Sequence, residues 1–99
     1  MAFVIFEVKS ENAGKINQLV KDDLVSRQSI VTRDASALDI DKEVMYVKIE
    51  GSDAGVKQAE KLAKELEFTK LGKKEADDVD EKIKSQEDSA ASGMGMIFD

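Results

Sequence analysis

EVMYVKIEGSDAGVKQAEKLAKEL, residues 43–66, is the stretch that decides the fold class. Residues 44–50 alternate between side chains of two kinds, which predicts a β-strand with Met45, Val47 and Ile49 facing a core. Tyr46, Lys48 and Glu50 are then expected to face solvent. Gly51 and Ser52 end the alternation, and serine is a favourable N-terminal cap. From residue 53 to residue 66, apolar side chains recur at helical spacing, which predicts an amphipathic helix: Val56, Ala59, Leu62, Ala63 and Leu66.

A second strand is predicted at residues 2–8, AFVIFEV. Phe3 and Ile5 lie on one face of it, and Val4, Phe6 and Val8 lie on the other. Because both faces are apolar, we expect a central strand with one face under the helices. Its second face is expected to be covered by a partner subunit or by a C-terminal element.

The remaining segments complete the pattern. Residues 10–24 predict a first helix, capped by Ser10 or Asn12. The segment 25–42 carries weaker signals: a strand at 29–35, then a long connection with a short helical turn at 35–38. Residues 68–71 predict a short edge strand that ends at Gly72. Residues 75–90 predict a helix whose apolar stripe is thin, so it needs a surface to pack against.

This order of elements predicts an α+β fold of the ferredoxin-like βαββαβ type. Four antiparallel strands would form one sheet, with two helices on one face, followed by a C-terminal helix and tail. With 99 residues the chain has room for one domain and an appendage. We therefore predict a ferredoxin-like domain at residues 1–72 and an acidic helix with an apolar tail at residues 73–99.

Composition excludes several function classes. The chain has no Cys and no His, so disulfides, thiolate nucleophiles, imidazole bases and Cys/His zinc sites are absent. No pair of carboxylate, Lys, Ser or Tyr side chains matches a catalytic motif, so we expect no enzyme, no cofactor and no metal. The net charge of −6 argues against nucleic acids and anionic membranes as partners. No apolar run approaches the roughly 20 residues of a membrane span, so a cytoplasmic protein is expected.

The sequence Asn12-Ala13-Gly14 lies where the first strand meets the first helix. With the order of elements over residues 2–71, it resembles the ACT-like group of ferredoxin-like domains, in which an acidic residue and Pro-Gly often occupy this place. Here Ala13 replaces the proline. The resemblance implies a domain that binds an amino acid or a similar metabolite at a subunit interface. It implies ligand contacts from Asn12 and Gly14; the alternative is an ordinary capped helix in which the glycine is only tolerated.

The two arginines, Arg27 and Arg33, fall in one short segment. If that segment is extended, their even spacing places both on one side, and arginine suits carboxylate or phosphate recognition. With Lys48 and Tyr46 on a neighbouring strand they would form an anion-binding patch. The alternative is a solvated face with local pairing to acidic neighbours.

The chain ends in a strongly apolar tail, in which Gly93 and Gly95 alternate with Met94 and Met96 and are followed by Ile97 and Phe98. Flexible methionines suit adaptable contacts. The tail could cap its own core, dock on a neighbouring subunit, remain disordered or bind another protein.

Two functions are predicted. The first is a non-enzymatic, small-molecule-binding or regulatory module that acts as a homodimer, with Asn12, Gly14, Arg27 and Arg33 at the ligand. The second is an adaptor that binds another protein through its C-terminal helix and its GMGMIF tail.

Overall fold

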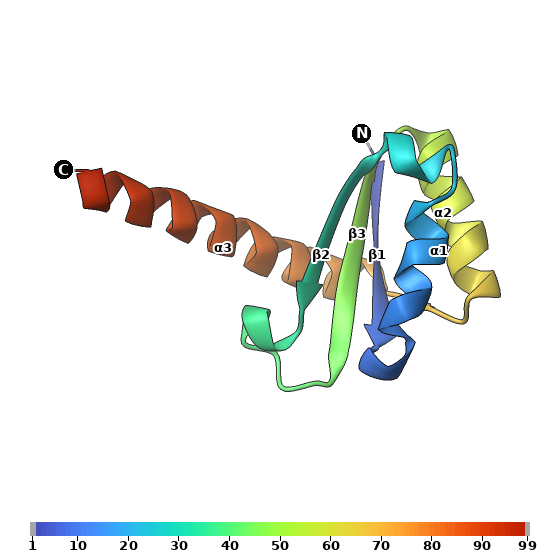
Figure 1. Ribbon diagram of the computed structural model, residues 1–99, viewed down its shortest axis with the longest axis horizontal. Helices are drawn as coiled ribbons and strands as arrows, with labels where there is room; N and C mark the ends of the chain where they lie inside the picture. The colour runs from blue at the N-terminus through green and yellow to red at the C-terminus, as the bar shows by residue number, and fades with distance from the viewer. Residues whose placement is uncertain (1, 99) are drawn as a thin grey trace.

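The computed structural model describes the backbone of residues 2–98 and the side chains of residues 2–86. It is an α+β structure in which strands and helices alternate along the chain (Figure 1). The strands are β1 (Ala2–Lys9), β2 (Ser29–Asp34), β3 (Val44–Gly51) and β4 (Thr69–Lys70). The α-helices are α1 (Ile16–Val20), α2 (Asp53–Glu65) and α3 (Lys73–Phe98), and short 3₁₀ segments are η1 (Ser10–Lys15), η2 (Val25–Arg27) and η3 (Ser36–Leu38).

The four strands form one antiparallel sheet in the order β2-β3-β1-β4. Strand β1 pairs with β3 along its whole length, from Ala2 opposite Gly51 to Lys9 opposite Val44. On its other side, β1 pairs with the short β4 only at Phe6 and Glu7. All four strands predicted from the sequence are therefore present, with small changes at their ends.

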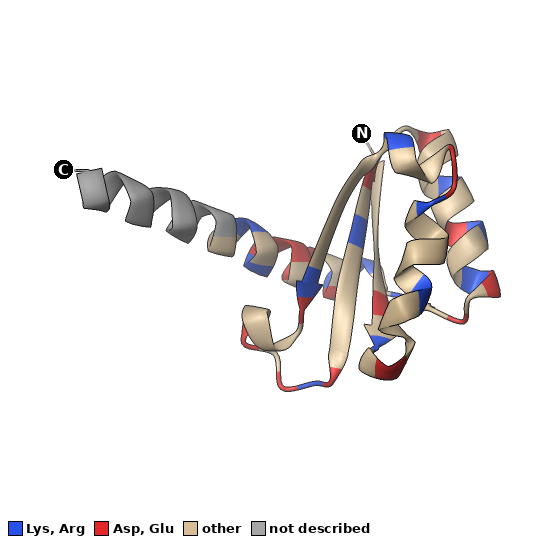
Figure 2. Cartoon of the chain, in the orientation of Figure 1, with Lys and Arg blue, Asp and Glu red and all other residues tan. Residues whose placement is uncertain are grey.

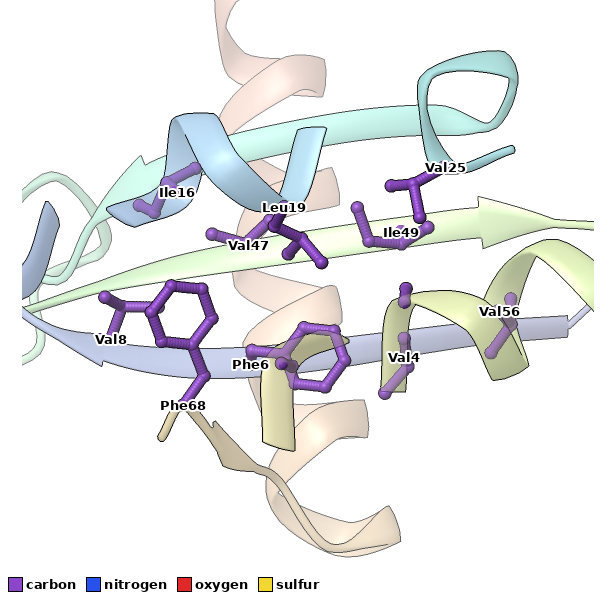
Figure 3. Close-up of a cluster of buried hydrophobic side chains, with 12 residues drawn as sticks. Val4, Phe6, Val8, Ile16, Leu19, Val25, Val47, Ile49, Val56 and Phe68 are labelled. Atoms are coloured by element: carbon purple, nitrogen blue, oxygen red, sulfur yellow. The ribbon is translucent and has the colours of Figure 1, made fainter. Parts of the chain in front are cut away.

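One face of the sheet packs against α1 and α2 (Figure 3). Because side chains alternate along a strand, every second residue of β1 and β3 points to this side. Val47 and Ile49 are buried here, as their predicted direction requires. We call this set the first cluster, and its buried members all precede residue 69: Val4, Phe6, Val8, Ile16, Leu19, Val25, Val47, Ile49, Val56, Ala59, Ala63 and Phe68.

The opposite face is covered by α3, which crosses behind the strands in Figure 3. This corrects the expected exposure of two β3 residues, because Tyr46 is only 3% exposed and Lys48 only 7%. Alternation placed both on the second face of the sheet, and α3 then buries that face. The second cluster consists of Ile5, Ala35, Leu38, Tyr46, Leu71, Ala76, Val79 and Ile83. Of the coverings expected for the second face of β1, the C-terminal element is the one present.

Polar contacts also join α3 to the sheet. Lys48 of β3 forms a buried ion pair with Asp80 of α3. Burial of the Asp80 carboxyl opposes its ionisation, but hydrogen bonds from Lys48 and Lys84 outweigh this effect and lower the pKa of Asp80 below its usual value. Farther along α3, the Gln86 side chain accepts a hydrogen bond from Arg33 Nε (3.0 Å) and donates one to the Ala37 carbonyl (2.7 Å).

The first helix departs from its prediction. Residues 10–15 form the 3₁₀ segment η1, and the α-helix that follows has only five residues. Neither Ser10 nor Asn12 caps it, since Lys9 holds the N-cap position of η1 and makes no side-chain cap hydrogen bond. Gly14 lies in this segment, and glycine is unfavourable in the interior of an α-helix.

Charged residues of both signs are interspersed along α2 and the first turns of α3 (Figure 2). Among the helices described, none combines the length and apolar character needed to cross a membrane.

Candidate functional site

A groove lies between α1 and the helix side of β2, and its volume is about 500 Å³. It forms because α2 packs over β1 and β3, while α1 is too short to extend over the edge strand. Ile30 of β2 is therefore only half-buried on this side, and Thr32 is exposed. The lining residues come from η1, α1, η2, β2 and β3: Ala13, Ile16, Asn17, Val20, Ser26, Ile30, Thr32 and Met45.

The groove has an apolar lining with a few polar groups and no charged side chain. Ile16, Val20, Ile30 and Met45 supply most of the apolar surface. Asn17, Ser26 and Thr32 supply amide and hydroxyl groups that can donate or accept hydrogen bonds. Small-molecule sites have this composition, with apolar walls and a few placed polar groups.

Asp22 stabilises the turn that follows α1, and this turn forms one wall of the groove. Asp22 Oδ2 accepts hydrogen bonds from the Leu24 and Val25 amides (both 3.1 Å), and its Oδ1 accepts one from Gln58 of α2 (3.1 Å). The bond from Val25, followed by that from Gln58, lowers the pKa of Asp22. This turn directs Val25 into the first cluster and leaves Ser26 at the groove.

Gln28 fixes the entry to β2 against the start of α2. Its amide nitrogen donates to the Leu24 carbonyl (2.9 Å), and its Oε1 accepts from the Ser52 amide (3.0 Å). Ser52 is the N-cap of α2, as predicted, and its hydroxyl accepts from the Gly55 amide (3.1 Å). A Cβ on Gly51 or on Gly55 would overlap the Gln28 side chain, so both glycines leave room for it.

We expect Gly55→Ala to lower the free energy of unfolding by about 1 kcal/mol. The new methyl group displaces Gln28, and each lost hydrogen bond costs about 0.5–1.5 kcal/mol. Alanine is more favourable than glycine inside a helix by roughly 0.5–1 kcal/mol, and this offsets part of the loss in stability. Urea unfolding of the two proteins measures the difference.

The matched control is the same substitution in a Gln28→Ala background. There the methyl group meets no amide, so Gly55→Ala should raise stability instead. A loss of equal size in both backgrounds would mean that Gln28 is not what the glycine accommodates.

The residues predicted to bind a ligand are not among those that line this groove. Ala13, between Asn12 and Gly14, is in the wall, while Asn12 is half-buried and Gly14 is exposed. A Cβ on Gly14 would meet open space within this chain.

The arginines are not brought together as one patch. Arg27 belongs to η2, so the segment is not extended throughout, and its guanidinium pairs with Asp23 (3.3 Å) on the exposed surface. Arg33 reaches Gln86 of α3, and its Nη1 also donates to the Thr32 carbonyl (2.8 Å). Lys48 is buried against Asp80. Arg33 does lie directly opposite Tyr46 in the β2–β3 ladder, on the face of the sheet that carries Lys48. The predicted patch is therefore wrong in its inclusion of Arg27, which lies in η2.

Tyr46 instead belongs to a second hollow, of about 380 Å³, between α3 and residues 40–42. Its hydroxyl lies 3.4 Å from Glu7 Oε1, and Lys42 donates to the same oxygen (3.2 Å). Burial, followed by the charge of Glu7, raises the pKa of Tyr46. Leu71 and Val79 complete the apolar floor of this hollow.

Within the described residues, no group of three or more acidic side chains is placed to hold a metal ion. Met94, Met96, Ile97 and Phe98 lie outside the described side chains, so their predicted partner binding stays a prediction. Comparisons with protein-family models, with curated proteins and with solved structures found no match.

The sequence did not identify the groove residues as a set. Ile16 and Val20 recur at helical spacing in residues 10–24, which predicts only a helix there, and Ile30 belongs to the segment with the weaker strand signals. A groove depends on where a helix ends relative to a strand, and apolar periodicity does not carry that information. Asn17 and Ser26 belong to no sequence motif that would mark them as binding residues.

Proposed function

We propose that the chain is a non-enzymatic binding module that takes a small, mainly apolar metabolite in the groove between α1 and β2. The observation that supports this is the lining itself, in which apolar side chains are joined by Asn17, Ser26 and Thr32 and by no charged group. A carboxylate ligand would have to be held from outside the lining, for example by Arg27. We therefore favour a neutral ligand over the amino acid or other anion expected from the sequence.

The order of the strands also supports the place proposed for the ligand. The strand order β2-β3-β1-β4, with α1 and α2 packed on one face, agrees with a ferredoxin-like arrangement. The ACT-like resemblance would place ligand contacts at the turn that contains Ala13, and this turn adjoins the groove. Fold resemblance alone does not define a ligand, so the proposal depends on the lining.

The test is a two-dimensional amide NMR titration with pooled neutral metabolites and, separately, with pooled amino acids and organic acids. We expect shifts at residues 13–17 and 26–32 with a neutral ligand. The variant Asn17→Trp should fill the groove and weaken that ligand at least about tenfold, because a bulky ring occupies its place.

The matched control is Gln18→Trp, since Gln18 is an exposed neighbour on α1 that does not line the groove. Binding that is equally weakened by both substitutions would place the ligand elsewhere. Shifts with anions alone would favour the arginine-based prediction.

The groove is described from the residues of one chain. The homodimer expected from the sequence rested partly on the apolar second face of β1, which α3 covers within the chain. It stays a prediction, and light scattering across a concentration series checks it.

A further inference from the structure

The part of α3 that is described contributes nothing to the first cluster. That cluster is formed by residues 4–68, on the side of the sheet that carries α1 and α2. The sheet ladder is likewise complete before α3 begins, at residue 70. The body of the domain therefore has its own core and its own sheet without α3.

The connection into α3 is short and has a natural pivot. The Leu71 amide donates to the Ile5 carbonyl (3.0 Å), which ties the chain to β1 up to that residue. The helix then begins at once, since the Ala76 amide donates to the Gly72 carbonyl (2.8 Å). Gly72 lies between these two points in open space, where a Cβ would touch nothing. Rotation at Gly72 would move α3 while leaving β4 paired.

The contact between α3 and the sheet is narrow. Among residues 73–86, Ala76, Val79 and Ile83 are the buried apolar side chains of α3. Beside them lies the hollow of about 380 Å³, which opens to the surface between α3 and residues 40–42. The other attachments are the Lys48–Asp80 ion pair and the Gln86 hydrogen bonds.

The face beneath α3 has a defined chemical requirement. Lys48 is buried among apolar groups, with its Nζ 5.3 Å from the centre of the Phe3 ring. Its Nζ also lies 3.7 Å from Glu50 Oε1 of the same strand, but the Glu50 side chain is more exposed than that of Asp80. The covering helix therefore supplies the closer and more buried carboxylate for an ammonium group whose unpaired charge would be costly. A helix suits this face if it has an acidic residue at position i and apolar residues at positions i−4, i−1 and i+3. Ala76, Val79, Asp80 and Ile83 form this pattern.

We propose that this face of the sheet is an interaction surface for α3 of a second copy, so that two chains can exchange their C-terminal helices by rotation at Gly72. Each sheet would then bury the partner's copy of the same apolar stripe, and each Lys48 would pair with the partner's Asp80. The surface lies on the opposite side of the sheet from the α1–β2 groove and is independent of the function proposed for that groove.

In the unaltered chain the intramolecular arrangement dominates at low concentration. A short linker gives an effective concentration of about a millimolar, so exchange competes only near that concentration. A decisive experiment must therefore remove the intramolecular option while preserving the intermolecular one.

Two full-length charge-reversal variants achieve this. In Lys48→Asp the sheet and its own helix both present an acid, and in Asp80→Lys both present an amine. When the two variants are mixed, every sheet can find a complementary helix only in a one-to-one exchanged dimer. Sedimentation equilibrium at micromolar concentration measures the association of each variant and of the mixture.

We expect the mixture to form a heterodimer at least about 100-fold tighter than either variant alone, since like charges oppose both homodimers. The doubly reversed chain, Lys48→Asp with Asp80→Lys, restores the pair within one molecule and should remain monomeric. A mixture of folded variants that stays monomeric would overturn the proposal.

A milder pair covers the case in which a reversal prevents folding. Lys48→Met presents an apolar sheet position and Asp80→Leu an apolar helix position, so the same complementarity exists only between the two chains. Amide spectra of residues 4–68 report whether the first cluster is intact. If the charge-reversal variants do not fold, a monomeric mixture of the folded milder pair overturns the proposal in the same way.

Discussion

The variant Asp80→Ala should lose hydrogen-exchange protection at the amides of residues 76–86 while the sheet stays protected. Removing the carboxylate leaves buried Lys48 without its closest partner, although Glu50 stays 3.7 Å away. Breaking a buried ion pair costs up to about 3–5 kcal/mol, and Glu50 places the expected cost at the lower end of this range. Burying Val79 and Ile83 contributes roughly 1.5–3 kcal/mol each, as an upper estimate. The cost is comparable with the whole contact, so α3 should leave the sheet and let Lys48 reach water.

The control variant replaces both partners, with Lys48→Met and Asp80→Leu in one chain. Apolar replacement of a buried pair is often neutral or stabilising, so this chain should protect α3 as well as the natural sequence does. If Asp80→Ala alone retained protection within about 1 kcal/mol of the unaltered chain, the ion pair would not be what holds the helix.

The variant Phe6→Ala should lower the free energy of global unfolding by about 3–5 kcal/mol. Phe6 is 1% exposed in the first cluster, which also contains Phe68 (Figure 3). A domain of this size has a total stability of about 5–15 kcal/mol, so the variant should be close to unfolding. Urea denaturation followed by circular dichroism gives the value.

Phe3→Ala is the matched control on the same strand. Phe3 points to the opposite face and is only half-buried, so the same chemical deletion should cost much less. Equal losses at the two positions would contradict the division into a main core and a separately covered face.

The strand–helix unit at residues 43–66 was predictable because its signals are local. Alternation sets the strand, and Ser52 with the apolar stripe sets the helix. The predicted ends of α2 differ from the observed Asp53–Glu65 by a single residue. Strand β2 was also found at its predicted place, although its sequence alone was ambiguous.

The errors share a cause. Alternation correctly assigned Lys48 and Tyr46 to the second face of the sheet. Whether that face is exposed to solvent depends on α3, which is more than twenty residues away along the chain. The thin stripe of α3 indicated that it needed a surface without identifying which one. The groove arises from the early end of α1, where Asp22 accepts two backbone amides and turns the chain toward β2.

Arg33 has a consequence for how the chain behaves when concentrated. Strand β2 is at the edge of the sheet, and the Ala35 amide donates to the Val44 carbonyl, so by alternation the carbonyl of Thr32 faces away from β3. Exposed edges of this kind template strand addition and, with it, aggregation. The guanidinium of Arg33 donates a hydrogen bond to the Thr32 carbonyl and places a positive charge beside it. We therefore expect Arg33, which the sequence suggested as an anion-binding residue, to disfavour the addition of another strand at this edge.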